Sequence, residues 1–213
     1  MLIFLGGPGS GKGTQARFLS KFDNFKIFSV GELLRLEISG KTDIGKKIEQ
    51  TINQGEFAST QIIMDLFKKH VNQERVILDG FPRNLEQANA LENFFTENNF
   101  FDEKKLLVID FLVSNELLTN RLMHRKICKI CDASLQENEI VCSFCGNESE
   151  DAYKRSDDND LVIKKRIKKF EDETFILKEF YKKKKLYEAI DAEADPKLVY
   201  NQIRSCIVAR NLL

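Results

Sequence analysis

The chain begins with the stretch that decides its fold, MLIFLGGPGSGKGT at residues 1–14. Residues 2–5 form a short apolar run suited to a buried strand, and residues 14–19 are typical of the helix that follows. Between them the spacing G-x-x-x-x-G-K places small residues where backbone N–H groups surround phosphate oxygens, in front of a helix N-terminus. This order of glycines and lysine disfavours a turn without a chemical role. We therefore predict a loop that binds a nucleoside triphosphate, formed by Gly9, Ser10, Gly11, Lys12, Gly13 and Thr14.

Two positions of this loop carry separate expectations. Lys12 is expected to supply a point charge for the β and γ phosphates. Gly13 is a departure, because the general motif has a Ser or Thr there that binds magnesium. Thr14 follows one place later.

Length and composition are those of a soluble enzyme. The 213 residues suffice for one α/β core with insertions, and 33 basic residues balance 33 acidic ones. A net charge of zero provides no general attraction to nucleic acid. The N-terminus lacks a signal-peptide pattern, and the longest apolar stretch, residues 106–113, is strand-length and interrupted by Asp110. Together with five cysteines, these features predict a cytoplasmic protein without membrane or nucleic-acid partners.

Short apolar runs alternate with helical stretches along most of the chain. The runs lie at residues 2–5, 25–28, 75–78, 106–111 and 186–190, and the clearest helical pattern covers about 159–184. This alternation predicts an α/β fold with a parallel sheet and helices on both faces. Two segments interrupt the alternation and look like insertions into one core. They are the first insertion (residues 29–58) and the cysteine segment (residues 126–157).

The cysteine segment carries two C-x-x-C pairs with ten residues between them. A tetrahedral zinc ion needs four soft donors, and four thiolates leave no position for water. We therefore predict a structural zinc site, with two disulfides or four free thiols as the alternatives. His124 is expected at the exposed end of a helix, and Cys206 as a small buried apolar residue. The predicted metal ligands are Cys128, Cys131, Cys142 and Cys145.

A strand-to-turn transition, VILDGFPR at residues 76–83, places a carboxylate and a guanidinium at the carboxyl end of a strand. In open α/β sheets ligands bind at this edge. Asp79 is expected to hold magnesium through its water shell, and Arg83 to bind a phosphate. Taken alone, the pattern is equally typical of an ordinary turn with a capping Asp.

Further arginines suit phosphoryl transfer, because its transition state spreads negative charge that cations stabilise. Arg121 and Arg125 are four residues apart on a helix that starts near Asn115, so they share one face. The alternative is a solvated basic surface, which we prefer for the lysines at 164–165 and 182–185. The other candidates are Arg35, Arg155 and Arg166.

Over essentially its whole length the chain resembles the adenylate kinases of the bacterial, long-lid, zinc-containing type. The loop GGPGSGKGT resembles the phosphate-binding loop of that family, including the Gly after the Lys. Residues 79–83 with Gln87 are similar to the signature D-G-F-P-R-x-x-x-Q. The pairs Arg121 with Arg125, and Arg155 with Asp157 and Asp158, also match.

The resemblance implies transfer of a phosphoryl group from magnesium-bound ATP to AMP, giving two ADP, by a monomer with a five-stranded parallel core. Its parts would be a core (1–28, 59–125 and 158–213), an AMP-binding insertion (29–58) and a zinc-binding lid (126–157). Catalytic roles would fall to Lys12, Arg83, Arg125, Arg155 and Arg166. ATP would also contact the phosphate-binding loop, Arg121, Ser134 and Leu135. AMP would contact Val30, Arg35, Glu56, Phe57, Ala58, Gly80, Phe81, Pro82, Arg83, Gln87, Arg155 and Arg166.

Two departures from the family pattern concern recognition of the nucleotide bases. Val30 replaces the usual Thr, which removes a side-chain contact to AMP, and ten residues between the cysteine pairs make the lid short. Two alternatives remain at this point. One is a kinase for a pyrimidine or guanine monophosphate, and the other is a zinc-ribbon ATPase that depends on nucleic acid. The neutral charge and the glutamates of the cysteine segment disfavour the second.

Overall fold

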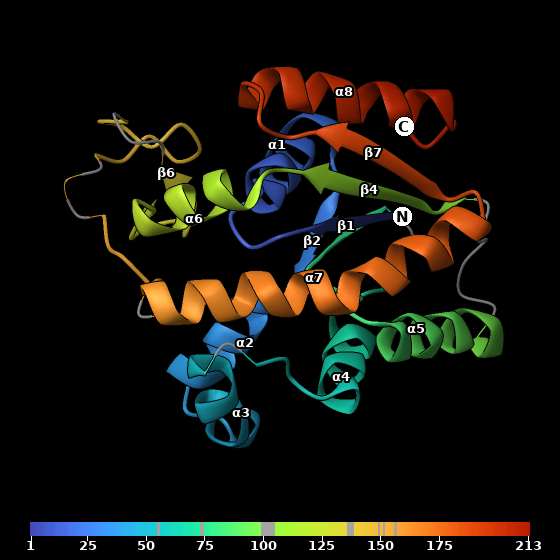
Figure 1. The fold of residues 1–213 in the computed structure, drawn as a ribbon, viewed down its shortest axis with the longest axis horizontal. Coiled ribbons are helices and arrows are strands. Elements are labelled where there is room, and N and C mark those ends of the chain that lie inside the picture. The colour runs from blue at the N-terminus through green and yellow to red at the C-terminus, as the bar shows by residue number, and fades with distance from the viewer. Residues whose placement is uncertain are drawn as a thin grey trace.

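A computed structural model describes residues 1–54, 56–72, 75–98, 105–135, 139–148, 150, 152–155 and 157–213. Its centre is a parallel sheet of five strands in the order β2-β3-β1-β4-β7 (Figure 1). The predicted α/β class and all five predicted strands are thus confirmed. The strands are β1 (Leu2–Gly6), β2 (Lys26–Ser29), β3 (Val76–Asp79), β4 (Leu107–Leu112) and β7 (Tyr187–Asp191).

Eight helices and one small hairpin complete the described part of the chain. The helix predicted over residues 159–184 is confirmed as α7, which starts after Asn159, whose side chain accepts a hydrogen bond from the Val162 N–H. The hairpin is β5 (Lys126–Ile127) with β6 (Ser134–Leu135). The helices are α1 (Lys12–Asp23), α2 (Val30–Ser39), α3 (Asp43–Asn53), α4 (Thr60–His70), α5 (Leu85–Asn98), α6 (Asn115–Met123), α7 (Asp160–Lys183) and α8 (Pro196–Ala209).

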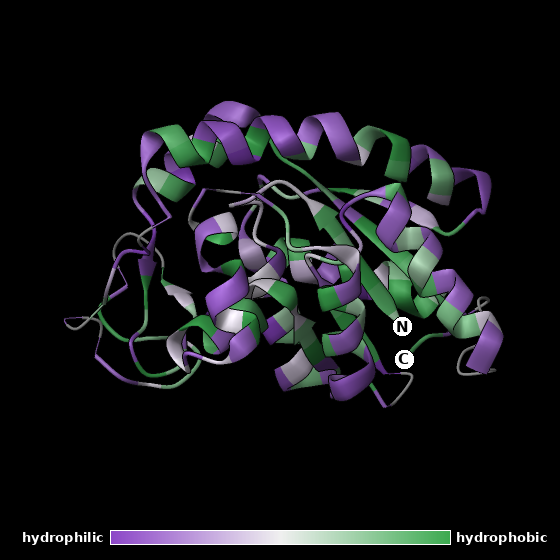
Figure 2. Ribbon diagram, turned by 90° about the horizontal axis from the view of Figure 1, so that it is seen from below, coloured by the Kyte–Doolittle hydropathy of each residue, from purple (hydrophilic) through white to green (hydrophobic). Residues whose placement is uncertain are grey.

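The sheet is buried on both faces, and alternate residues of β1 pack into separate cores. Leu2 and Phe4 pack with apolar residues of α1 and α8, whereas Ile3 and Leu5 pack with those of α4, α5 and α7. This follows from the period of two along a strand, which sends successive side chains to opposite faces. Figure 2 shows the result as hydrophobic strands inside helices whose outer faces are largely hydrophilic.

The two predicted insertions lie toward the same side of the sheet, that of the carboxyl ends of its strands (Figure 1). Residues 29–58 contain α2 and α3, which lie beneath α7 in Figure 1, and the cysteine segment lies beyond α6. Helices α2 and α3 approach so closely that a Cβ at Gly45 would lie 2.0 Å from the Glu37 carbonyl oxygen. Only glycine permits this approach.

One buried carboxylate ties α7 to the sheet. Asp110 in β4 is fully buried, accepts a hydrogen bond from the Tyr187 hydroxyl at 2.6 Å and forms an ion pair with Lys178 at 2.7 Å. A buried charge requires such partners, and this explains how an Asp interrupts the apolar run at 106–113. Among the described helices, none has the length and apolar character needed to cross a bilayer.

Candidate active site

A cavity of about 1130 Å³ opens at the carboxyl ends of the strands. Its floor is the phosphate-binding loop, and its walls come from both insertions, α7 and the turn after β7. This is the edge where open α/β sheets bind ligands, because the strand-to-helix turns meet there. The predicted site residues in its lining are Gly9–Thr14, Arg35, Glu56, Phe57, Asp79, Gly80, Pro82, Arg83, Arg121, Arg125, Ser134, Leu135, Arg155 and Arg166.

The phosphate-binding loop has the backbone that its glycines predict. Gly9 has φ 83° and Gly11 has φ 92°, in the region that favours glycine. A Cβ at Gly9 would also lie 3.1 Å from the Leu118 carbonyl of α6. Gly11 precedes α1 without a side-chain cap, so the first turn presents backbone N–H groups to the cavity for an anion.

Lys12 folds over this loop. Its ammonium donates hydrogen bonds to the carbonyl oxygens of Gly6 at 2.7 Å and Gly7 at 2.8 Å, and to the Ser10 hydroxyl at 3.1 Å. Burial lowers the pKa of Lys12 to about 8, and the charge of Asp79 opposes this shift only in part. The ammonium is thus held by neutral acceptors, in an environment that favours the approach of an anion.

Asp79 lies at the end of β3, opposite the loop. Its carboxylate accepts a hydrogen bond from the Ser29 hydroxyl at 3.4 Å and would lie 3.8 Å from a Cβ at Gly13. A side chain at Gly13 would therefore approach this carboxylate. The absence of one leaves Asp79 facing the loop, as expected for a group that binds a cation beside phosphates.

A cluster of partly buried arginines forms one wall of the cavity. Arg125 donates two hydrogen bonds to the fully buried Asp158, at 2.8 and 2.5 Å, and Arg166 donates one to Asp157 at 2.7 Å. Arg155 has a buried Nε without a hydrogen-bond partner. Burial, together with the charges of Arg125 and Arg35, lowers the pKa of Arg155 to about 10. Positive charge exceeds negative charge in this wall, as a site for several phosphates requires.

Arg83 is oriented by the turn that contains it. Its Nε donates to the Gly80 carbonyl at 2.8 Å, and its backbone N–H donates to the side-chain oxygen of Gln87 at 2.8 Å. Burial lowers the pKa of Arg83 to about 10, and the neighbouring Arg166 contributes. Gln87 is 1% exposed, so in this structure it supports the turn. The predicted residues Val30, Ala58, Phe81 and Gln87 are all buried outside the cavity lining.

The turn after β7 is a part of the site that the sequence did not indicate. Arg121 donates to the carbonyl oxygens of Ala192 at 3.1 Å and Glu193 at 3.4 Å. Residues 192–197 line the cavity. The sequence signal that could have identified this turn is its position directly after the last predicted strand, since ligands bind at the carboxyl ends of strands in open α/β sheets.

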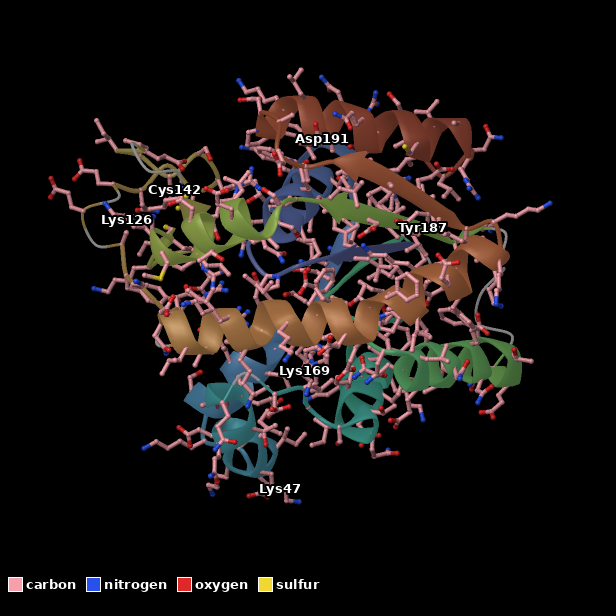
Figure 3. The ribbon with its side chains drawn as sticks, viewed as in Figure 1. Lys47, Lys126, Cys142, Lys169, Tyr187 and Asp191 are labelled. Atoms are coloured by element: carbon pink, nitrogen blue, oxygen red, sulfur yellow. The ribbon has the colours of Figure 1, made fainter. Side chains whose placement is uncertain are left out.

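The four predicted cysteines converge in the cysteine segment. Their sulfur atoms all lie within 4.8 Å of one another, with Cys128 and Cys145 at 3.6 Å and Cys131 and Cys142 at 3.7 Å. All four are free cysteines, so no disulfide joins them. Four soft donors at this spacing fit a tetrahedral zinc ion. Cys142 is labelled in Figure 3.

His124 and Cys206 lie outside the sulfur cluster. His124 is exposed at the end of α6 as predicted, where its ring contacts the Asn120 carbonyl at 3.0 Å. Cys206, in α8, is only partly buried and packs against the apolar core beside that helix. Cys206 thus packs as a small apolar residue, as expected, although it is only partly buried.

The cysteine segment reaches the core across the cavity. Phe144, between Cys142 and Cys145, packs on Phe18 of α1 with ring centroids 5.2 Å apart. Both rings line the cavity. Neither was predicted, because nothing in the local sequence indicates that these two segments meet.

Comparison with known proteins agrees with this site. A family model described as adenylate kinase matches residues 4–186. The adenylate kinase of Caldicellulosiruptor bescii is 35% identical, over 87% of this chain and 88% of the relative. The adenylate kinase of Borrelia garinii subsp. bavariensis is 33% identical over 99% of both chains, and that of Methanocella arvoryzae is 35% identical over 96% and 97%. With a phosphate-binding loop facing a wall of arginines, this chain belongs to the adenylate kinase family, whose reaction is phosphoryl transfer from ATP to AMP.

Proposed function

We propose that the two ends of the cavity hold the two nucleotides of this reaction, ATP on the phosphate-binding loop and AMP against the first insertion. The observation that carries this assignment is the arginine wall between the two ends, where the transferred group would lie. Arg83, Arg155 and Arg166 would contact the phosphate of AMP and stabilise the charge of the transferred group, and Lys12 would contact the β and γ phosphates. Catalysis would then consist of positioning and cationic stabilisation, as phosphoryl transfer requires.

The two insertions would act as the moving walls of this site. The cysteine segment would be a lid over ATP, with Arg121 and the turn after β7 at the base and Arg125 on the phosphates. The first insertion would bind AMP through Arg35 and the backbone of residues 56–58. The contact between Phe144 and Phe18 supports such a closed arrangement, in which water is excluded from the phosphates.

Two metal ions would serve different purposes. Magnesium bound with ATP would neutralise phosphate charge, and Asp79 would hold it through water, as its position opposite the loop supports. Zinc would be bound by the four cysteines and would have a structural role, because four thiolates complete its shell.

Replacement of Arg125 by alanine is expected to raise KM for ATP and to lower kcat by about 10²-fold, since one preorganised cation is lost. Steady-state kinetics with either substrate varied will measure both effects. The neighbouring Lys126 is exposed, so Lys126→Ala serves as the matched control and should leave both constants unchanged. Normal kinetics in a folded Arg125→Ala protein would remove Arg125 from the mechanism.

A panel of nucleoside monophosphates tests the assignment of the second site. With ATP as donor, AMP is expected to react faster than CMP, UMP or GMP by about tenfold or more in kcat/KM. The comparison matters here because Val30 is buried and offers no hydrogen bond to a base. Equal rates with all four monophosphates would show that the first insertion does not select adenine.

A further inference from the structure

Two successive residues of the first insertion connect it to the long helix α7. Glu56 forms an ion pair with Lys165 at 2.7 Å, and its second oxygen accepts a hydrogen bond from Lys169. These two lysines are four residues apart, so they project from the same face of α7. Figure 3 labels Lys169 on the side of α7 that faces the first insertion. One carboxylate thus joins two elements that are 113 residues apart in the chain.

The side chain of Phe57 lies between this connection and the arginine wall. The Arg83 guanidinium lies 4.9 Å from the centre of the Phe57 ring, and the Lys169 ammonium lies 4.7 Å from it. Cations are attracted to an aromatic ring at these distances by its quadrupole. Phe57 also lines the cavity, so it contacts Arg83 beside the space for substrate.

Arg83 depends on neutral groups for its orientation. Within the described residues, no carboxylate forms an ion pair with its guanidinium, which instead bonds to the Gly80 carbonyl and lies on Phe57. Such an arrangement leaves the charge of Arg83 available to a phosphate. The Phe57 ring and the Gly80 carbonyl together orient the guanidinium.

The charge of Glu56 persists over the working range of pH. Hydrogen bonds from Lys165 and Lys169 lower the pKa of Glu56 to about 2, so it remains ionised at neutral pH. Lys169 lies in addition 3.9 Å from Glu173, on its own helix. By contrast, Lys164 pairs only locally with Asp160, at 2.8 Å on the exposed side of α7.

We propose that Glu56 and Phe57 form a latch that fastens the first insertion to α7 and places Arg83 for the phosphate of the monophosphate substrate. Glu56 supplies the attachment, and Phe57 is a positioning residue that acts through Arg83. This inference rests on the proposed function in one respect, that Arg83 contacts the phosphate of AMP. It adds a role for two side chains whose backbone alone was expected to line the site.

Steady-state kinetics on four variants of the full-length protein test the latch. Phe57→Leu and Glu56→Gln are expected to raise KM for AMP by about tenfold, with KM for ATP unchanged. Phe57→Tyr keeps an aromatic ring and should retain the wild-type KM for AMP. Lys164→Gln is the matched control, because it removes only the local ion pair with Asp160. It should leave the KM values for AMP and ATP unchanged. Thermal midpoints of all four variants will show that each is folded.

An exchange of charge between residues 56 and 165 provides a second test of the latch. Glu56→Lys places a third cation beside Lys165 and Lys169 and should raise KM for AMP further than Glu56→Gln. Adding Lys165→Glu restores an opposite-charge pair without changing the net charge of the wild-type cluster, and it should recover most of the loss. Recovery would show that the ion pair between residues 56 and 165, and not either side chain alone, supports binding of AMP.

The outcomes separate the latch from the proposed function. Wild-type KM for AMP in Phe57→Leu, a parallel rise of both KM values, or no recovery in the charge exchange would each overturn the latch alone. A wild-type protein that formed no ADP from ATP and AMP would overturn the proposed function and the latch together.

Discussion

Replacement of Lys12 by methionine is expected to lower kcat by at least ~10²-fold, because one preorganised cation at the β and γ phosphates is lost. The ammonium lies within the phosphate-binding loop, bonded to Gly6 and Gly7, and methionine fills similar space without a charge. ADP formation measured at saturating ATP and AMP will give the effect on kcat directly. Near-normal turnover would show that the loop does not serve this reaction.

The same substitution should not lower the stability of the fold. Burial lowers the pKa of Lys12 from 10.5 to about 8, so the unfolded chain binds a proton that the folded chain releases between these values. The contribution of Lys12 to the free energy of unfolding therefore rises with pH between about 8 and 10.5. At pH 7 the side chain is charged, and the burial of that charge lowers the free energy of unfolding. Lys12→Met removes that cost, and its thermal midpoint at pH 7 should equal or exceed that of the wild type. Lys21→Met, at an exposed position of the same helix, is the control for activity.

Removal of the metal is expected to unfold the cysteine segment before the sheet and to lower the thermal midpoint. The hairpin β5–β6 has two residues in each strand, and its buried apolar cluster consists of Cys128, Ala133, Leu135 and Cys142. So small a core cannot hold a fold alone, and metal coordination replaces it. Freshly purified, reduced protein should contain about one zinc per chain. Hydrogen exchange after chelation should show loss of protection in residues 126–157, while ATP still binds to the loop.

Single substitutions test the same point without a chelator. Cys128→Ala should lower both zinc content and the thermal midpoint, and it should raise KM for ATP because the lid no longer closes. Cys206→Ala is the matched control, since this fifth cysteine lies in α8 outside the cluster. Fully reduced wild-type protein without zinc would contradict the structural metal site. Immediate loss of turnover on chelation, with the cysteine segment still protected, would instead assign the ion to catalysis.

The sequence predicted those features that neighbouring residues specify. The five strands followed from short apolar runs, and α7 followed from its apolar spacing. The turn between β1 and α1 followed from the order of its glycines and lysine, and the sulfur cluster followed from two C-x-x-C pairs. In each case the residues that determine the feature lie within one short stretch of the chain, so the local sequence pattern is sufficient to predict it.

The partners of the site side chains depended on the tertiary structure. Residues at 56 and 169, 57 and 83, or 18 and 144 meet only because the sheet order brings their segments to one edge. The same holds for Arg121 and the turn at 192–193. Sequence by itself determined which residue types could bind phosphate and metal in this protein. Only the packing of distant elements decided which of them share a cavity, because contacts of long sequence separation leave no local pattern.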